Sequence, residues 1–273
     1  MMNVQRTFFL LLCSTLAIDA KISMQSLQSS VSQLFKTKKE EESITKEFND
    51  VDQLEILCKQ ATIFIHTWKQ PSTFVEIKKI GSKQQLCATD IDFIYYDHLL
   101  QIHPLVEQEK QSSSIVITII TPETARVKVA TQSGNIVIKN LDGEIEAHTD
   151  SGNITIIDGS HNATMHTKDG AILLQRETMQ NTDLIKATTD KGSITLQVPQ
   201  YINSFIQAQT KKGKIYSDLL VTVEPKITKL NNAVYKEQKQ SVTGSLQKDK
   251  ESFVSGNIYL ETKHGTIFIK NYV

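Results

Sequence analysis

The chain has 273 residues, of which 39% are apolar and 22% charged, a composition that excludes disorder over the whole length. Its 30 basic and 30 acidic side chains cancel, so no net field favours nucleic acid or an anionic membrane surface. Nearly all the basic residues are lysines, and only Arg6, Arg126 and Arg176 can form forked contacts to phosphate. A nucleic-acid partner is therefore not expected.

Residues 1–20 have the pattern of an export signal. Arg6 supplies the positive start, Phe8–Ala17 form an apolar run, and Ala20 is a small residue at a suitable cleavage site. A buried amino-terminal helix is the alternative, but a run of about ten apolar residues is too short to span a bilayer. We therefore predict a signal peptide over 1–20 and no transmembrane helix after its removal. The mature chain is expected in the periplasm, in the cell envelope or outside the cell. Cys13 follows leucines rather than small residues, which disfavours a lipid anchor.

The segment 21–48 has the composition of a polar spacer, helical or disordered. Apolar residues at helical spacing run from Met24 to Phe35, and a charged stretch follows from Lys36 to Glu42. Over residues 49–122 the pattern changes to short β-rich runs broken by polar turns, which predicts the N-terminal β-rich part of the domain. Cys58 and Cys87 lie in such runs. In an exported protein they could form a disulfide, and each could equally pack as a single thiol.

One repeated unit decides the prediction for residues 123–273. The spacing Thr-x-x-Gly-x-Ile-x-Ile recurs along this part, and only Ser217 breaks its apolar column. The glycines from 134 to 213 are 18, 18, 22 and 21 residues apart, a period typical of a solenoid. The sequence thus predicts an all-β, single-stranded β-solenoid or β-helix-like stack of short strands, with an N-terminal β-rich cap. The threonines and glycines expected to build its core and corners are Thr131, Gly134, Thr149, Gly152, Thr167, Gly170, Thr189, Gly192, Thr210, Gly213, Thr262 and Gly265.

Strand alternation separates an inner face from an outer face. Residues two apart point the same way, so Ile154 and Ile156 should face inward together with the threonine before each corner. Glu144 and Glu146 should then face water. We expect the corner glycines to adopt a positive φ and the inward threonines to bond turn amides. Aspartate, serine and asparagine near the corners should bond local backbone.

These repeats resemble those of the bacterial "putative adhesin" domain family. The resemblance covers about Phe48 to Val273. It includes a hydrophobic strand ending in Pro122, the run Leu196–Pro199, and a closing coil over 254–273 that contains Gly256-Asn-Ile-Tyr-Leu-Glu-Thr-Lys-His-Gly265-Thr-Ile. The resemblance implies an exported β-solenoid whose function is largely unassigned. This chain departs from the pattern between residues 215 and 255, where a polar loop is expected over about 230–252. Its Lys-, Gln- and Asp-rich part, Lys236–Glu251, is either a binding loop or a solvent-exposed loop without a binding function.

No catalytic, cofactor or metal site is predicted. Stacking would bring together Glu144, Glu146, Asp150, Asp169 and Asp190, and such acids could serve a polysaccharide-active enzyme. The three aspartates lie at the glycine corners, however, where turn chemistry explains them. His148 and His166 could stack one coil apart, but no third ligand accompanies them.

We therefore expect a non-catalytic envelope or surface protein that binds an unknown protein or a surface glycan, as the resemblance to adhesins implies. An envelope-stress or regulatory interaction module is the alternative, and a β-helix enzyme is a further one.

Overall fold

The computed structural model describes residues 39–106, 113–159, 162–179, 183–199, 202, 204–219, 221–223, 240–246 and 256–272. The predicted signal peptide and the helical part of the predicted spacer, Met24–Phe35, lie outside the described residues. By its internal contacts the chain divides into residues 1–40 and 41–273, and the fold belongs to the second unit. In the described part of the chain, no helix is long and apolar enough to cross a membrane.

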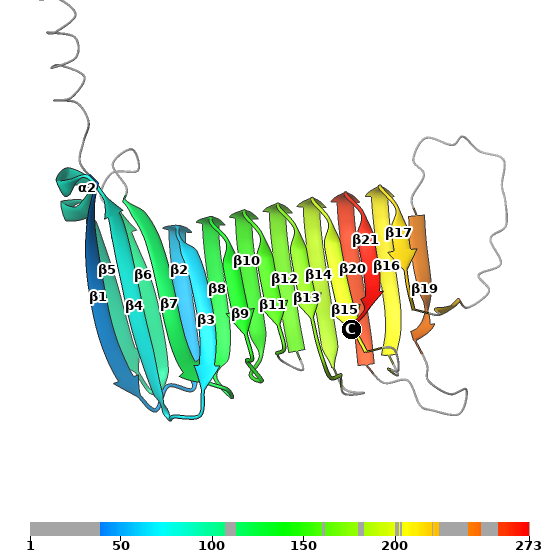
Figure 1. Ribbon diagram of the computed structural model, residues 1–273, viewed down its shortest axis with the longest axis horizontal. Helices are drawn as coiled ribbons and strands as arrows, with labels where there is room; N and C mark the ends of the chain where they lie inside the picture. Colours follow the sequence, from blue (N-terminus) through cyan, green and yellow to red (C-terminus); the bar gives the residue numbers. More distant parts are fainter. Residues whose placement is uncertain are drawn as a thin grey trace, which may run out of the picture. The chain divides into compact units, whose positions relative to one another are not determined.

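The prediction of an all-β chain is confirmed: two large sheets face each other, with one short helix, α2 (Lys83–Cys87), among the described residues (Figure 1). The first sheet, sheet A, has the strand order β1 (Glu40–Asn49), β4 (Ser72–Gly81), β7 (Ser114–Pro122), β3 (Thr62–Trp68), β9 (Ile136–Lys139), β11 (Ile154–Ile157), β13 (Ile172–Gln175), β15 (Ile194–Val198), β21 (Ile267–Asn271) and β17 (Ile215–Ser217). The second, sheet B, has the order β18 (Thr222–Val223), β19 (Gln240–Leu246), β16 (Ser204–Lys212), β20 (Gly256–His264), β14 (Leu184–Lys191), β12 (Asn162–Asp169), β10 (Ile145–Ser151), β8 (Arg126–Ser133), β2 (Gln53–Gln60), β6 (Leu99–Val106) and β5 (Thr89–Tyr96).

Each repeat unit contributes one longer strand to sheet B, a corner, and one shorter strand to sheet A. Neighbouring units pair in parallel and in register, so that Thr149 lies beside Thr131 and Thr167. In sheet A, Ile154 lies in the same way beside Ile136 and Ile172. Equivalent positions of the repeat therefore form straight columns across the sheets.

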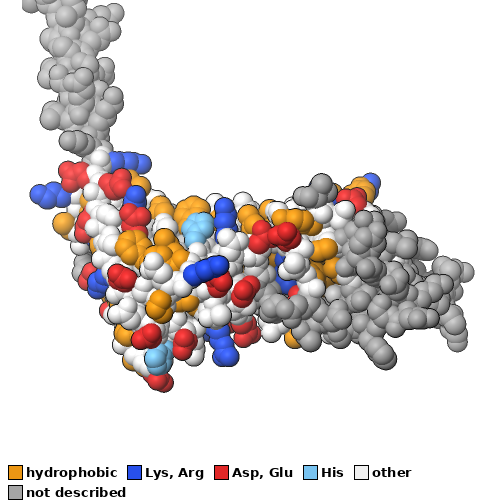
Figure 2. All heavy atoms as spheres, turned by 60° about the horizontal axis from the view of Figure 1, so that its bottom comes forward, with side chains coloured by type: hydrophobic (Ala, Val, Ile, Leu, Met, Phe, Trp, Pro, Cys, Tyr) orange, Lys and Arg blue, Asp and Glu red, His pale blue; other side chains and the backbone are white. Residues whose placement is uncertain are grey.

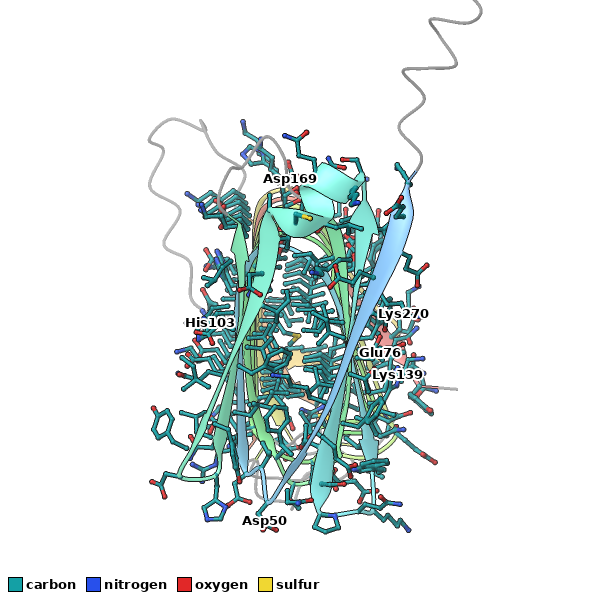
Figure 3. The ribbon with its side chains drawn as sticks, turned by 90° about the vertical axis from the view of Figure 1, so that its left-hand side faces the viewer. Asp50, Glu76, His103, Lys139, Asp169 and Lys270 are labelled. Carbon is teal, nitrogen blue, oxygen red and sulfur yellow. The ribbon has the colours of Figure 1, made fainter. Side chains whose placement is uncertain are left out.

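The aliphatic columns fill the space between the two sheets. Ile154 and Ile156 are both 0% exposed, and the equivalent residues of the other units belong to the same continuous core. Figure 3 shows these side chains meeting between the sheets, while Glu76, Lys139 and Lys270 point away on one side and His103 on the other. A single unit has no neighbour to cover its aliphatic side chains, so burial requires the stacked arrangement, at about 1.5 to 3 kcal/mol per side chain.

Five of the buried threonines bond the neighbouring unit rather than their own turn, whereas Thr131 bonds the Ser133 carbonyl of its own corner at 3.1 Å. The hydroxyls of Thr149, Thr167 and Thr189 donate to the carbonyls of the glycine in the adjacent unit at 3.2, 3.0 and 3.0 Å. Thr262 and Thr210 do the same at 3.1 and 3.0 Å. The expectation that they bond turn amides is wrong, because the corner carbonyl of the next unit is the group that points at the hydroxyl. These bonds tie successive corners to each other.

We expect Thr149→Val to destabilise the fold by about 0.5 to 1.5 kcal/mol, because the isosteric change leaves the part-buried Gly134 carbonyl without its hydroxyl donor. Thr155→Val, on the outer face of sheet A, is the matched control and should change the free energy of unfolding little. Chemical denaturation of both variants measures the difference. Equal free energies of unfolding would mean that the hydroxyl column contributes nothing.

The corner glycines are required mainly by close stacking. A Cβ at Gly134, Gly152, Gly170, Gly192, Gly213 or Gly265 would lie 1.8 to 2.1 Å from a carbonyl oxygen of the neighbouring corner. Only Gly134, Gly152 and Gly192 of this set have a positive φ. The expectation that the corner glycines adopt a positive φ is therefore confirmed at three positions and wrong at Gly170, Gly213 and Gly265, because the six positions share the close approach and not the backbone angle.

The closing coil is not at the end of the stack. Strand β20 lies between β14 and β16, and β21 lies between β15 and β17, so the last unit of the chain is inserted before the preceding one. The same exchange occurs near the other end, where β2 lies between β6 and β8. Because of these two exchanges, β2 and β20 lie between other strands of sheet B rather than at its edges. Their backbone N–H and C=O groups can therefore form hydrogen bonds on both sides.

Two segments differ from the predicted domain boundaries. β1 (Glu40–Asn49) occupies residues assigned to the spacer, and β19 (Gln240–Leu246) occupies part of the expected polar loop. β19 pairs antiparallel with β16. On β1 only Ile44 and Phe48 pack against the core. An edge strand that buries few apolar side chains leaves a weak hydrophobic pattern, which explains why the sequence did not reveal β1.

Cys58 and Cys87 are both free thiols, so the disulfide alternative is wrong. Cys58 occupies the threonine position of its unit, in register with Thr131, and its Sγ lies 3.8 Å from the Ala130 carbonyl oxygen. Burial raises the pKa of the Cys58 thiol. Cys87 is exposed at the end of α2, on a different element, and the fold gives the two sulfur atoms separate environments.

Candidate binding face

The outer side of sheet B carries polar side chains in straight rows across the strands. We define the polar face as the outward residues of β10, β12, β14, β20 and β16. Its middle row runs from His148 through His166 and Thr188 to Glu261 and Gln209. Because adjacent strands are about 4.8 Å apart, each row holds its groups at a fixed and regular spacing.

A second row of the polar face alternates in charge. The Lys168 Nζ lies 2.8 Å from Oδ1 of Asp150, and the Lys263 Nζ lies 2.8 Å from Oδ1 of Asp190. The hydrogen bond from Lys168 holds the pKa of Asp150 below its usual range, and that from Lys263 does the same for the pKa of Asp190. The prediction that these aspartates serve turn chemistry is wrong, because both belong to strands and pair with lysines of the adjacent strand.

His148 and His166 stack as the sequence suggested, with ring centroids 5.0 Å apart and an angle of 12° between the rings. The Nε2 atom of His148 lies 3.2 Å from Asp150 Oδ1, and the Nδ1 atom of His166 lies 2.8 Å from Thr188 Oγ1. Burial, followed by the neighbouring His148, lowers the pKa of His166. Within the described residues, no group of three or more His, Cys, Asp or Glu side chains is placed to hold a metal ion.

A shallow cleft of about 550 Å³ opens on the polar face where β12, β14 and β20 meet. Tyr259 donates its hydroxyl proton to Glu261 and accepts a hydrogen bond from Gln209 at 3.1 Å. Burial and this bond to Glu261 raise the pKa of Tyr259 to about 12. The residues that line the cleft are His166, Lys186, Thr188, Thr189, Asp190, Tyr259, Glu261 and Lys263. No pattern in the sequence pointed to Tyr259, Glu261 or Lys263, because their strand is far along the chain from β12 and β14.

The acids named from the sequence do not form one cluster. Asp150 and Asp190 lie on strands separated by β12, and Lys168 of that strand stands between them in the row. Asp169 is the last residue of β12, in register with Ser151 and Lys191, and is exposed (Figure 3). Glu144 and Glu146 line a second depression of about 310 Å³, in which Glu55 pairs with Lys128 at 3.2 Å. Asp150 and Asp190 are thus separated by a lysine rather than paired with each other.

Sheet A has a different outer face. Its central row is uncharged and passes in register through Phe64, Val137, Thr155, Leu173, Thr195, Phe268 and Tyr216. The rings of Phe268 and Tyr216 stack with centroids 5.6 Å apart. Charged pairs on sheet A lie instead at its β1–β4 edge, where Lys78 is 3.5 Å from Glu76 and Lys79 is 2.9 Å from Glu42.

We expect Lys168→Gln to raise the pKa of Asp150 toward its ordinary value of 3.8, because the Lys168 ammonium is the first cause of its depression. A carboxylate with a lowered folded-state pKa contributes stability above its unfolded pKa, and that contribution is lost as pH falls through the folded value. Carboxyl titration by NMR measures the shift. Lys263→Gln is the control and should raise the pKa of Asp190 instead. If the pKa of Asp150 is the same in Lys168→Gln as in the wild type, the ion pair does not form in solution.

No protein-family model matches this chain. No curated protein matches it either. Among solved structures, a putative cell adhesion protein from Clostridium sporogenes is 13% identical, with 86% of this chain and 100% of that chain covered and a TM-score of 0.49. A putative adhesin from Bacteroides fragilis is 14% identical, with 84% and 97% covered and a TM-score of 0.44. A third, from Parabacteroides distasonis, is 11% identical, with 85% and 98% covered and a TM-score of 0.28. At these values the likeness assigns no function to this chain.

Proposed function

We propose that the chain is a non-catalytic, exported protein of the bacterial envelope or surface that contacts a partner through the polar face. In this proposal the two sheets form a β-solenoid, and the stacked units serve as a stiff frame for the rows of side chains. The proposal extends the adhesin role implied by the sequence resemblance. Export rests on the pattern of residues 1–20.

The observation that carries the proposal is the order of the polar face. Its rows repeat at the strand spacing, and ion pairs and hydrogen bonds between adjacent strands fix their side chains. Side chains that are already ordered lose little conformational freedom when a partner binds. A long, ordered face of this kind suits recognition of an extended partner better than enclosure of a small substrate.

The ionisation of Asp150, Asp190 and Glu55 argues against a general acid among them. General acid catalysis requires a carboxyl group whose pKa is raised toward neutrality. The pKa values of Asp150 and Asp190 are lowered by their lysine partners, and the pKa of Glu55 is lowered by its hydrogen bond with Gln101. Carboxylates held in the charged form are suited to binding and not to proton donation.

Complementation of a deletion strain tests the proposal. Loss of the gene should reduce attachment of cells to surfaces or to other cells, and the wild-type gene should restore it. A Lys186→Glu variant changes the polar face, whereas Gln197→Glu makes a single charge change on the outer side of sheet A. The first should fail to restore attachment and the second should succeed.

Two results would contradict this role. Turnover of a polysaccharide panel that disappears in Asp150→Asn, with folding intact, would identify an enzyme. Altered expression of envelope genes without an attachment defect would identify the regulatory module instead. Cell fractionation tests export independently, because the mature protein should be absent from the cytoplasm and should begin after residue 20.

A further inference from the structure

We propose that the cleft on β12, β14 and β20 binds an uncharged saccharide. The inference rests on the proposed function and names the chemistry of the partner at that face. The cleft volume of about 550 Å³ lies within the range of about 300 to 1,000 Å³ found for small-molecule sites. Its lining residues come from three adjacent strands, so more than one sugar unit could contact it.

The hydrogen-bonding groups of the cleft are held in place before a ligand arrives. Lys263 is bound to Asp190 at 2.8 Å, and His166 to Thr188 at 2.8 Å. The hydroxyl of Tyr259 is fixed from two sides, by Glu261 and by a Gln209 amide 3.1 Å away. A ligand therefore meets an ordered array of donors and acceptors, which lowers the entropic cost of binding.

Charge balance favours a neutral ligand. Lys186 and Lys263 contribute two positive charges, and Asp190 and Glu261 contribute two negative charges. The lowered pKa of His166 favours its neutral form. Elsewhere on the molecule, Figure 2 shows acidic and basic side chains interspersed on the edge that lies at the bottom of Figure 1. A charged polymer would meet attraction and repulsion at adjacent positions, so the charges of the cleft would give it no net electrostatic attraction.

Sugar hydroxyls match this array of alternating groups. A hydroxyl both donates and accepts a hydrogen bond, so neighbouring hydroxyls can donate to Asp190 and Glu261 and accept from Lys186 and Lys263. The ring of Tyr259 adds an apolar surface of the kind that the C–H groups of a sugar ring contact. Adjacent strands are about 4.8 Å apart, so successive sugars of an extended glycan could meet groups on successive strands of one row.

Binding of neutral oligosaccharides to the purified mature chain tests the inference. Maltohexaose, cellohexaose and mannohexaose are the probes, with heparin and poly-L-lysine as charged comparators, and calorimetry and ligand-observed NMR are the readouts. At least one neutral hexasaccharide should bind, and Lys186→Ala and Glu261→Gln should each weaken it by about tenfold. Gln175→Ala, on the outer side of sheet A, is the control and should bind as the wild type does.

Three outcomes would overturn the inference: no neutral hexasaccharide binds, only a charged comparator binds, or binding is equal in the wild type and in both cleft variants. Unchanged melting temperatures show that the variants are folded. If Lys186→Glu abolishes attachment while no hexasaccharide binds, the inference fails and the proposed function stands. If a hexasaccharide binds at the cleft but deletion leaves attachment unchanged, the saccharide site stands and the proposed function fails.

Discussion

Gly192→Ala is expected to destabilise the fold by about 3 kcal/mol or more. The added Cβ would lie 1.9 Å from the Gly170 carbonyl oxygen, and the backbone φ at this position is +147°. The obstructing atom is backbone within a continuous ladder, so relief of the clash requires neighbouring units to separate. Such a separation would also weaken the bonds from Thr189 and Thr262 to the corner carbonyls.

The control for this prediction is Gly81→Ala. The nearest atoms to a Cβ at Gly81 are Oε1 and Cβ of Gln85, 2.9 and 3.0 Å away, so a smaller displacement relieves the contact, at the cost of disturbing the bond that Oε1 accepts from the Ser82 amide. Urea denaturation of both variants gives the free energies of unfolding. If Gly192→Ala unfolds at the same urea concentration as Gly81→Ala, the close approach of the corners is not a requirement of the fold.

Ile154→Asp should destabilise the protein by several kcal/mol, because it places a carboxylate without a partner between the two sheets. Ile154 is 0% exposed and lies in register with Ile136 and Ile172, which are similarly buried. Glu146→Lys, on the exposed side of β10, should change stability little. Thermal unfolding followed by circular dichroism compares the two. Equal melting temperatures would mean that the inner and outer faces are assigned the wrong way round.

The sequence predicted the repeat and its faces because both depend on local periodicity. Strand alternation assigned Ile154 to the interior and Glu146 to solvent, and the repeat spacing aligned Thr149 with Thr167. The stacking of His148 on His166 follows from that alignment and is confirmed. The candidate site was less predictable, because Lys186 and Tyr259 become neighbours only when β20 pairs with β14.

By itself, the sequence determined an all-β chain of repeated strand-turn-strand units and which residues of each unit share a face. The tertiary structure decided the spatial order of the units, the lysine partners of Asp150 and Asp190, and the position of the cleft. Side-chain alternation and repeat length are properties of contiguous residues, so they can be read along the chain. Equivalent units offer nearly equivalent strand edges for pairing. The sequence of a strand therefore does not say which other strand pairs with it. Global packing, including the antiparallel β19 on β16, therefore selects the order.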